Sequence, residues 1–343
     1  MFQFKYYEAS KEEEWDRFIA QNAVNGTFLQ SRHFLNYHKP GKFQDVSLMV
    51  YDEKNRLAAL IPACEIVQEE KKTFYSHKGT TFGGIIISQK YYKAEAVMIL
   101  VRQLLDFLKT LAYDEVYLKQ TPDLFSKREN ALWQYVYAYY GFLEYKELST
   151  YVDLPVKAED IAAGLSNGKR RNVREGIKKG LDFRPLDQKE HIADFYSVLC
   201  ENLKKYGAVP VHTLEELLEF KDLRLPDRCG FFGVFKDGVL LAGCMVFYFQ
   251  ENTCVHTQYL AARQEYQKLS PMSYLYYALM MEMKKRGYQK ISWGISTEDY
   301  GTRLNMGLIR NKESFGSSYC NNLTYYYDLA QWLSSGYVRG GDA

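Results

Sequence analysis

The clearest pattern along the chain is a stripe of apolar residues at helical spacing, and it occurs twice. Between residues 94 and 111, and again between residues 271 and 286, apolar side chains recur every three or four positions, which is the spacing of one face of an α-helix. We therefore predict two long amphipathic helices, one in each half of the chain. Their stripes are Val97, Leu100, Val101, Leu104, Leu108 and Leu111, and Met272, Leu275, Tyr276, Leu279, Met280 and Met283.

The segments around the two helices also correspond. A hairpin precedes each helix and a short apolar strand follows it, and this order predicts mixed sheets with helices on their faces, an α/β fold. The hairpins are expected at 47–51 with 57–68 and at 230–235 with 239–249, turning at 52–55 and 236–238, and the strands that follow the helices at 114–118 and 288–293.

The repeated pattern predicts two tandem lobes. We place them at residues 1–150 and 151–330, with a boundary near 148–156 and a C-terminal tail at 331–343. No Gly- or Ser-rich linker lies at the boundary, so we expect the lobes to pack closely. Clefts between domains are preferred ligand sites, and the arrangement therefore predicts a binding cleft between the lobes.

The rest of the chain reads as further short elements. Ser10 is a predicted helix N-cap because a Glu stands three residues on and acidic residues fill the first turn. Thr213 is a predicted N-cap of the helix that follows it. The other helices are expected at 10–20, 27–37, 132–140, 158–165, 169–179, 191–206 and 214–220, and the other strands at 80–88, 150–154, 254–260 and 322–327.

Composition excludes several classes of protein. The chain has 44 Lys and Arg against 42 Asp and Glu, a net charge of +2, which argues against binding nucleic acid over the whole surface and allows one local basic patch. None of the six cysteines lies in a CxxC pair, and we predict no metal site. No apolar run approaches the length of a membrane span and no signal peptide is evident. We expect a cytoplasmic protein.

The first candidate site is the start of the second long helix. Ser270 is a suitable N-cap and Pro271 a suitable first helical residue. The unpaired N–H groups at such an end can bind phosphate, so Ser270 and Ser273 are candidate substrate contacts. Simple capping explains Ser270 and Pro271 as well, and no Gly-rich phosphate loop is present.

The second candidate is the basic segment 166–180. Arg170, Arg174 and Lys178 are spaced four apart and lie on one helical face. Such a face can bind the phosphates of a nucleotide, a tRNA end or an anionic lipid. The alternative is an ordinary solvated face of a surface helix.

The third candidate is the stretch from Trp293 to Gly316, which follows a strand. Lys312 could neutralise negative charge on a substrate or transition state there. No nucleophile and base can be paired from the sequence, because no GxSxG or HExxH motif occurs and the histidines are scattered, at His33, His38, His77, His191, His212 and His256.

Together these motifs resemble the FemAB family, the peptidoglycan-bridge aminoacyltransferases and their relatives. The matching pieces occur in the family's order over nearly the whole chain, and the ordered set is more specific than any single piece. They are Phe28-Leu29-Gln30-Ser31 with Phe34, Tyr151-Val152-Asp153-Leu154, Arg171-Asn172-Val173-Arg174, Lys178-Lys179-Gly180-Leu181, Leu269-Ser270-Pro271, Ser292-Trp293-Gly294 and Lys312-Glu313-Ser314-Phe315-Gly316.

The resemblance implies two tandem GNAT-like lobes and the transfer of an acyl or aminoacyl group to an amine. It implies aminoacyl-tRNA or acyl-CoA as the donor substrate, no permanently bound cofactor, and a small-molecule or cell-wall-precursor acceptor. It assigns Lys312 as the catalytic residue. His38 stands about where some members carry a substrate-contacting lysine, a departure from the family pattern. The chain also lacks the long coiled-coil arm of several bridge-forming members.

We predict six substrate-binding residues: His38, Arg171, Arg174, Tyr259, Ser270 and Ser273. Two other functions remain open. A non-catalytic ligand-binding module would bind a donor or acceptor without turnover. A nucleic-acid-binding protein would show binding that depends steeply on salt. The oligomeric state, the donor and the acceptor do not follow from the sequence.

Overall fold

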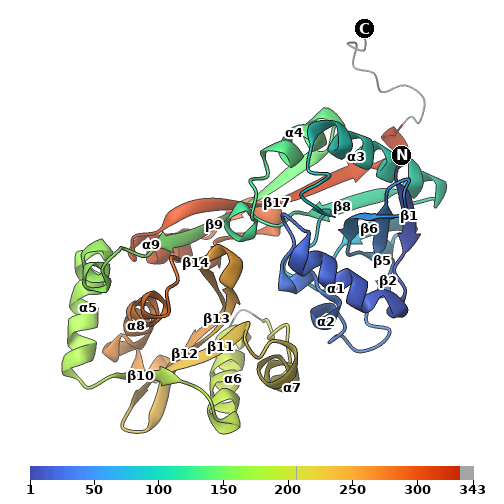
Figure 1. The fold of residues 1–343 in the computed structure, drawn as a ribbon. Helices are drawn as coiled ribbons and strands as arrows, with labels where there is room; N and C mark the ends of the chain where they lie inside the picture. The colour runs from blue at the N-terminus through green and yellow to red at the C-terminus, as the bar shows by residue number, and fades with distance from the viewer. Residues whose placement is uncertain (206, 333–343) are drawn as a thin grey trace. The chain divides into compact units, whose positions relative to one another are not determined.

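The computed structural model describes residues 1–205 and 207–332, and these divide into two compact units (Figure 1). Unit 1 comprises Met1–Lys146 and the chain from Asn321 onward, and unit 2 comprises Glu147–Cys320. Tyr206, the last residue of the helix predicted at 191–206, and residues 333–343 of the predicted tail lie outside the described residues.

Unit 1 contains two sheets and the helices that cover them. Strands β1, β3, β4 and β7 form one sheet, and β2, β5, β6, β8 and β17 follow one another in the second. The strands are β1 (Gln3–Tyr6), β2 (Gln44–Asp45), β3 (Leu48–Tyr51), β4 (Leu57–Ile61), β5 (Cys64–Gln68), β6 (Lys71–Ser76), β7 (Ile86–Ile87), β8 (Glu115–Lys119), β9 (Leu143–Asp153), which continues into unit 2, and β17 (Ser318–Asp328), which begins there.

The helices of unit 1 bury both faces of its β3–β4 hairpin. Val50 belongs to the core under the long helix α3, whereas its neighbour Met49 belongs to the core under α1, because successive strand residues point to opposite faces. The α-helices are α1 (Glu12–Gln21), α2 (Arg32–Leu35), α3 (Ala94–Thr110) and α4 (Ala131–Tyr139), and the 3₁₀ turns are Ala9–Lys11, Phe28–Gln30, Asp123–Phe125 and Leu329–Gln331.

Unit 2 is built on one sheet with strand order β10-β11-β12-β13-β14-β9. Its strands are β10 (Asp182–Pro185), β11 (Cys229–Lys236), β12 (Val239–Phe249), β13 (Cys254–Ala262) and β14 (Lys290–Ile295), with a separate hairpin of β15 (Thr297–Glu298) and β16 (Arg303–Leu304). Its α-helices are α5 (Asn167–Lys178), α6 (Lys189–Lys204), α7 (Leu214–Glu219), α8 (Pro271–Lys285) and α9 (Met306–Glu313). The remaining 3₁₀ segments are Ala158–Gly164, Gln250–Asn252, Gln264–Leu269 and Asp299–Gly301, and Phe220–Arg224 is a π-helical continuation of α7.

The helices of unit 2 cover the two faces of this sheet. Helices α5 and α8 lie on one side and α6 and α7 on the other (Figure 1). Phe232 packs in the core beside α8, whereas the preceding Phe231 contacts Phe195 of α6. This alternation places every second strand residue toward α8 and the others toward α6.

Both predicted hairpins and both long helices are present, but the returning strand expected at 57–68 is two strands, β4 and β5, which lie in different sheets. β3 pairs with β4 and β11 with β12, each antiparallel. The second hairpin turns at Asp237 and Gly238, whose φ angles of 49° and 82° are those of a tight turn that suits the right-handed twist of the strands. Each long helix lies in the connection between two parallel strands, β13 and β14 in unit 2 and β6 and β8 in unit 1, where the short β7 also precedes the helix. The repeated pattern of the sequence therefore corresponds to a repeated strand–helix–strand arrangement.

Several sequence predictions were wrong in detail. Ser10 is not a cap, because helix α1 begins two residues later and its N-cap residue Lys11 makes no side-chain capping bond. Only Ile86–Ile87 of the strand predicted at 80–88 is a strand. Strand β6, at Lys71–Ser76, was not predicted; it begins with two lysines before its buried end. Thr213 does cap α7 as predicted, and it also forms reciprocal bonds with Glu216.

The last strand belongs to a different unit from the one predicted. The linear division placed everything up to residue 330 in the second lobe, whereas β17 pairs antiparallel with β8 and so extends the sheet of unit 1. Its side chains Leu323, Tyr325 and Tyr327 complete the unit 1 core. In the described part of the chain, no helix is long and apolar enough to cross a membrane, and no three metal-binding side chains gather.

Candidate active site

Strands β13 and β14 of unit 2 separate after a short parallel ladder. They pair at only three positions, Cys254 with Lys290, Val255 with Ile291 and His256 with Ser292. Beyond these, β13 continues along β12 and β14 along β9, and each of those ladders has a register shift near the point of separation. The split therefore leaves one edge of β13 past His256 without a strand partner among the described residues.

The corresponding position in unit 1 is filled by the chain itself. After β6 and β8 pair as far as Ser76 and Leu118, the Gly83 N–H donates to the Lys119 carbonyl at 2.8 Å. A Cβ atom at Gly83 would lie 2.6 Å from the Ser76 carbonyl oxygen, so glycine is needed for this close approach. The Ser76 hydroxyl accepts from the Gly84 N–H at 2.7 Å. Of the two parallel strand pairs, β13–β14 and β6–β8, only β13–β14 leaves an unpaired strand edge among the described residues.

Lys312 lies at the end of β14, beside this split. Helix α9 directs its side chain inward, and its Nζ donates to the carbonyls of Gly294 at 2.9 Å and Ile295 at 2.7 Å. The residue is 2% exposed. Burial disfavours the charged amine and lowers the pKa of Lys312 to about 8. Lys312 thus fixes the last peptide groups of β14 and brings a positive charge to them.

Lys312 is expected to make folding stability rise with pH above 8. The folded lysine releases its proton near pH 8, whereas the unfolded one keeps it up to its ordinary pKa of 10.5. Between these values the unfolded state binds more protons, so the free energy of unfolding increases with pH, by about 3 kcal/mol in all. Below pH 8 both states are protonated and the contribution is constant.

Urea unfolding from pH 7 to 10.5 of the wild type and Lys312→Met checks this expectation. The stability difference between the two proteins should grow in favour of the wild type above pH 8. Lys285→Met, at an exposed lysine of α8, is the control and should show no such trend. A difference that stays constant with pH would contradict the assignment.

His256 and Ser292 face each other at the last paired position. His256 Nδ1 lies 3.0 Å from the Ser292 hydroxyl, which also accepts from the Gly294 N–H at 3.3 Å. Burial and the nearby Lys312 charge lower the pKa of His256 to about 4, so the imidazole is neutral at pH 7. Sequence reasoning missed this pair, because the two residues are 36 positions apart and only the parallel ladder brings them together.

Four buried polar atoms near the end of β14 have no hydrogen-bond partner among the described residues. They are Thr150 Oγ1, Trp293 Nε1, Ser296 Oγ and Thr297 Oγ1. Buried donors and acceptors are almost always paired with protein, water or ligand. Buried atoms of the same kind also occur in unit 1, such as Tyr137 Oη, so the four atoms at the end of β14 mark groups that a water or a polar ligand could bind.

A pocket of about 1220 Å³ lies at the N-terminus of α8. It is lined by residues from the end of α6, the end of β13 and the turn that follows it, α8, the β15–β16 hairpin and α9, and most of them are polar. Ser270 lines it but is not a side-chain cap: its φ of 52° is left-handed and it makes no capping bond. Ser273 also lines it, is buried, and receives a long 3.5 Å hydrogen bond from the Asn172 amide. Ser270 and Ser273 are therefore brought together at one pocket.

The basic helix α5 packs against α8 through its apolar side and presents its arginines outward. The side chains of Arg171 and Arg174 are exposed, with no hydrogen bond or ion pair to the described residues. Lys169 instead turns inward. It donates to the Asn311 side chain at 2.7 Å and lies over the Phe315 ring, and burial lowers its pKa. Of the predicted basic face, Arg170 donates to the Asn167 side chain and Lys178 is ion-paired with Glu175 at 3.6 Å. Arg174, and Arg171 outside that face, are the exposed arginines of α5.

Tyr259 lies on the part of β13 beyond the split. Its hydroxyl is 2.6 Å from His212 Nδ1, and burial raises the pKa of Tyr259 to about 12. Tyr259 does not line the pocket at α8. Its side chain is engaged with the segment that precedes α7.

His38 belongs to unit 1. Its Nε2 is 2.7 Å from the Gly79 carbonyl oxygen, and its ring packs against Tyr37 and Phe43. His38 does not line the pocket at α8 and does not belong to the split between β13 and β14.

The Gln30 of the N-terminal signature has a structural role in unit 1. It is fully buried. Its side-chain amide donates to the Gly83 carbonyl at 2.6 Å and the Thr121 hydroxyl at 2.8 Å, and its Oε1 accepts from the Thr27 N–H at 2.7 Å. The signature thus joins the start of α2 to the loop that closes the unit 1 counterpart of the split.

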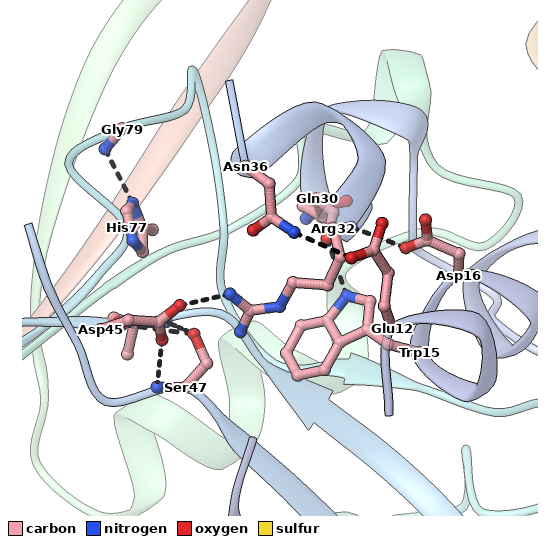
Figure 2. Close-up of polar contacts among 11 residues, drawn as sticks. Glu12, Trp15, Asp16, Gln30, Arg32, Asn36, Asp45, Ser47, His77 and Gly79 are labelled. Carbon is pink, nitrogen blue, oxygen red and sulfur yellow. Dashed lines mark hydrogen bonds and ion pairs between the residues drawn. The ribbon is translucent and has the colours of Figure 1, made fainter. Parts of the chain in front are cut away.

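Arg32, two residues on, is the centre of a buried polar network in unit 1 (Figure 2). Its guanidinium is ion-paired with Asp45 and lies over the rings of Tyr7 and Trp15. Arg32 is 1% exposed, and its Nε and Nη2 have no partner among the described residues. Burial by itself would raise the pKa of Asp45, but the Arg32 charge and hydrogen bonds from Arg32 and Ser47 hold it below its usual range. One carboxylate therefore neutralises a fully buried cation.

The comparisons with known proteins identify the fold. Residues 167–301, within unit 2, match the acetyltransferase (GNAT) domain family. No curated protein matches the chain by sequence. The structure is similar to the crystal structure of FemX, with a TM-score of 0.70 and 12% identity over 96% of this chain and 98% of that one.

Two further solved structures are similar over nearly their full lengths. One is L-PGS from Bacillus licheniformis, with a TM-score of 0.58 and 14% identity over 96% of this chain and 94% of that one. The other is a tandem GNAT protein from the clavulanic acid biosynthesis pathway, with a TM-score of 0.57 and 9% identity over 96% of this chain and 99% of that one. The predicted α/β class and tandem GNAT fold are confirmed.

Proposed function

We propose that this chain, in which residues 167–301 form a GNAT acetyltransferase domain and whose fold is that of tandem GNAT proteins, is an enzyme that transfers an acyl or aminoacyl group from an activated donor to an amine. The GNAT match supports acyl transfer in general. Which donor and which acceptor the enzyme uses is proposed in addition.

The observation that carries the proposal is the split between β13 and β14. A carbonyl group of an extended donor can lie along the unpaired edge of β13, where backbone N–H groups are available to bind it. The counterpart in unit 1 is closed by Gly83, so we assign the donor to unit 2. The unpaired polar atoms at the end of β14 supply further hydrogen bonds to it.

The chemistry asks little of the protein beyond positioning and charge. The amine nitrogen attacks the carbonyl carbon, a C–N bond forms, and the ester C–O or thioester C–S bond breaks. The leaving hydroxyl or thiol takes up the proton that the amine loses. Holding amine and carbonyl together can supply roughly 7–11 kcal/mol in favourable cases. Lys312, which fixes the Gly294 and Ile295 carbonyls, positions the end of β14 and contributes positive charge as the carbonyl oxygen becomes negative.

The pocket at the N-terminus of α8 is proposed to hold the nucleotide end of the donor. A helix N-terminus favours phosphate, and Ser270 and Ser273 line this pocket. Acyl-CoA carries phosphate groups on the adenosine at the end remote from its acyl group. An aminoacyl-tRNA carries a phosphate on the terminal adenosine, which also bears the aminoacyl ester, so a phosphate of either donor can bind here. The acceptor is proposed to be an amine of a small molecule or of a cell-wall precursor, on the strength of the FemAB resemblance.

The test is transfer of label from a donor to an amine. The protein is incubated with labelled acyl-CoA esters and with labelled aminoacyl-tRNAs, each together with small amines and amine-bearing cell-wall precursors. Formation of a labelled amide is the expected result. Absence of transfer from every donor, with the protein shown to be folded, would overturn the proposal and favour a binding module.

The two donors are distinguished by the basic face of α5. We expect the double variant Arg171→Glu, Arg174→Glu to bind an aminoacyl-tRNA donor roughly 10-fold or more weakly than the wild type. The salt dependence of this binding should also fall, because each phosphate that the protein no longer neutralises lowers the salt slope by about one. Both arginines are exposed, so folding should be unaffected. Affinity for an acyl-CoA donor should change much less.

Binding of both donors over a range of salt concentrations measures this effect. Lys285→Glu makes the same kind of charge reversal at an exposed position near the C-terminal end of α8 and is the control. An equal loss of tRNA binding in the control would mean that only the net charge matters. An unchanged tRNA affinity in the double variant would remove α5 from the donor site.

A further inference from the structure

A pocket of about 610 Å³ lies in unit 1, at the C-terminal end of α1. It is lined by residues from α1, from the β3–β4 hairpin and from the segment 88–91 in the connection between β7 and α3. Backbone hydrogen bonds hold this segment in place. The Ser88 N–H donates to the Ala58 carbonyl at 3.1 Å, and the next N–H donates to the Asn22 carbonyl, also at 3.1 Å. The volume is typical of small-molecule sites, and the proposed function assigns nothing to this pocket.

The side chain of Ser88 is directed into the pocket and is almost completely buried. The residue is 6% exposed and lines the pocket. Ile86 packs in the core under α1 and Ile87 in the core under α3, so the alternation of strand residues turns Ser88 toward α1. Its hydroxyl makes no hydrogen bond to the described residues. Because buried hydroxyls are normally bonded to protein, water or a ligand, Ser88 offers the pocket a hydrogen bond that the fold does not use.

Further hydrogen-bond donors surround the pocket. Four exposed ones are the side chains of Arg17, Gln21, Asn22 and Lys90. Lys90 has no carboxylate partner among the described residues, and its Nζ lies 4.9 Å from the centre of the Tyr91 ring. Arg17 lies 3.9 Å from Glu13, whose side chain is 93% exposed, and such a surface pair is weak. The two amides make no hydrogen bond to the described residues.

Arg56 and Tyr91 belong to the lining and are held in place by Asp52. Arg56 Nε donates to Asp52 at 2.7 Å, and the Tyr91 hydroxyl donates to the same carboxylate. Asp52 is itself 8% exposed and accepts from the Lys54 N–H at 2.9 Å. This side of the pocket is therefore formed before a ligand binds, which lowers the cost of binding. The Asp52 carboxylate offsets the charge of Arg56.

The remaining charges make the pocket positive. Glu14 is the one acid in the lining, and its carboxylate already accepts from Lys11 at 2.9 Å and from the Tyr51 hydroxyl at 3.2 Å. The C-terminal end of α1 contributes only about half a negative charge. Arg17 and Lys90 outweigh it, so the pocket favours an anion.

The number of donors favours a phosphate over a carboxylate. A phosphate ester has three terminal oxygens and close to two negative charges, whereas a carboxylate has two oxygens and one charge. Apolar contact for the rest of a ligand comes from Phe18, Leu57 and the Tyr91 ring. We propose that this pocket binds a small soluble molecule that carries a phosphate group on an aromatic or aliphatic body, with Ser88 and Lys90 bonding the phosphate oxygens. The inference does not depend on the proposed acyl transfer.

Calorimetric titration of the full chain with 1-naphthyl phosphate tests the site without turnover. We expect binding that weakens as salt is added, because salt screens the attraction between charges. 1-Naphthol, which lacks the anion, and 1-naphthoate, which carries a carboxylate instead, should bind roughly 10-fold more weakly or less. Naphthol or naphthoate that binds as tightly as the phosphate would overturn the assigned ligand class. A naphthyl phosphate that does not bind would overturn the site.

Variants show whether the probe occupies this pocket. Lys90→Glu should weaken its binding roughly 10-fold or more, and Ser88→Ala several-fold, since each removes a hydrogen bond to a charged group. Neither should lower the melting temperature, because Lys90 is exposed and the Ser88 hydroxyl has no partner among the described residues. Arg102→Glu, at an exposed arginine of α3 outside the lining, is the control. An equal loss in the control, or unchanged affinity in both pocket variants, would contradict the inference.

NMR locates the bound probe directly and separates this pocket from the one at α8. In protein labelled with ¹⁵N-asparagine, the side-chain amide resonances of Asn22 are assigned by their loss in Asn22→Ser. They should shift on addition of 1-naphthyl phosphate and stay in place with 1-naphthol. Asn22 resonances that do not move when the protein is saturated with the phosphate would overturn the inference and leave the proposed acyl transfer standing.

Discussion

Replacing Lys312 by methionine is expected to lower the rate of acyl transfer roughly 100-fold while the protein remains folded. Methionine has nearly the same length and fills the buried space. It cannot donate to the Gly294 and Ile295 carbonyls, which both bind the Lys312 amine. The end of β14 then loses the two bonds that fix it, and the site loses its buried positive charge. Both losses weaken stabilisation of the oxyanion more than binding of the ground state.

The measurement is kcat together with donor affinity for the wild type and the variant. Because Lys312 acts through β14, we expect kcat to fall while the Kd of the donor stays within a few-fold. Lys285→Met removes an exposed lysine from the same unit and should behave as the wild type does. A variant with the wild-type kcat would show that Lys312 is only structural. A loss confined to donor affinity would place it in binding and not in the chemical step.

Asp45→Asn is expected to destabilise unit 1 by about 3 kcal/mol, because it leaves the Arg32 cation buried without its counter-charge. Asparagine keeps the shape of the side chain and can still accept from the Ser47 N–H, which donates to Asp45 at 2.8 Å. Only the charge is removed. The Asp45 side chain is 41% exposed and Arg32 only 1%, so solvent already screens part of the attraction. We therefore expect the lower end of the range known for broken buried pairs.

The matched variant is Arg32→Met, which removes the buried cation and leaves Asp45 in contact with water. Replacing a buried ion by an apolar side chain of similar volume is often close to neutral, so Arg32→Met should cost much less than Asp45→Asn. The double variant should be more stable than Asp45→Asn alone. Urea unfolding measures all four proteins. Equal losses in the two single variants would show that the ion pair as a unit, and not the unpaired charge, determines the stability.

Local patterns predicted the regular elements well. The two apolar stripes became α3 and α8, within one residue of the expected ends. The turn at 236–238 became a hairpin because Asp237 and Gly238 adopt the positive φ angles that it requires. These features depend on residues close together in the sequence, so periodicity and turn chemistry are sufficient to find them.

Local patterns misled at the caps and the signature. Ser270 precedes a proline and has the residue type of a helix N-cap. Its backbone is left-handed, its side chain makes no capping bond, and it lines the pocket at the N-terminus of α8. Gln30 lies in a family signature and suggests function, yet all of its bonds hold unit 1 together. In both cases the sequence identified a special residue but not the partner that makes it special.

By itself the sequence determined the α/β class, the doubled strand–helix–strand plan and the position of Lys312 in a segment near the end of a strand. Only the tertiary structure decided that β13 and β14 separate after His256, that Gly83 closes the equivalent place in unit 1, and that β17 completes the sheet of unit 1. The physical reason is the range of the interactions. Helices and tight turns are encoded by neighbours within a few residues, whereas a split between two strands depends on hydrogen bonds between residues tens of positions apart, which no local pattern records.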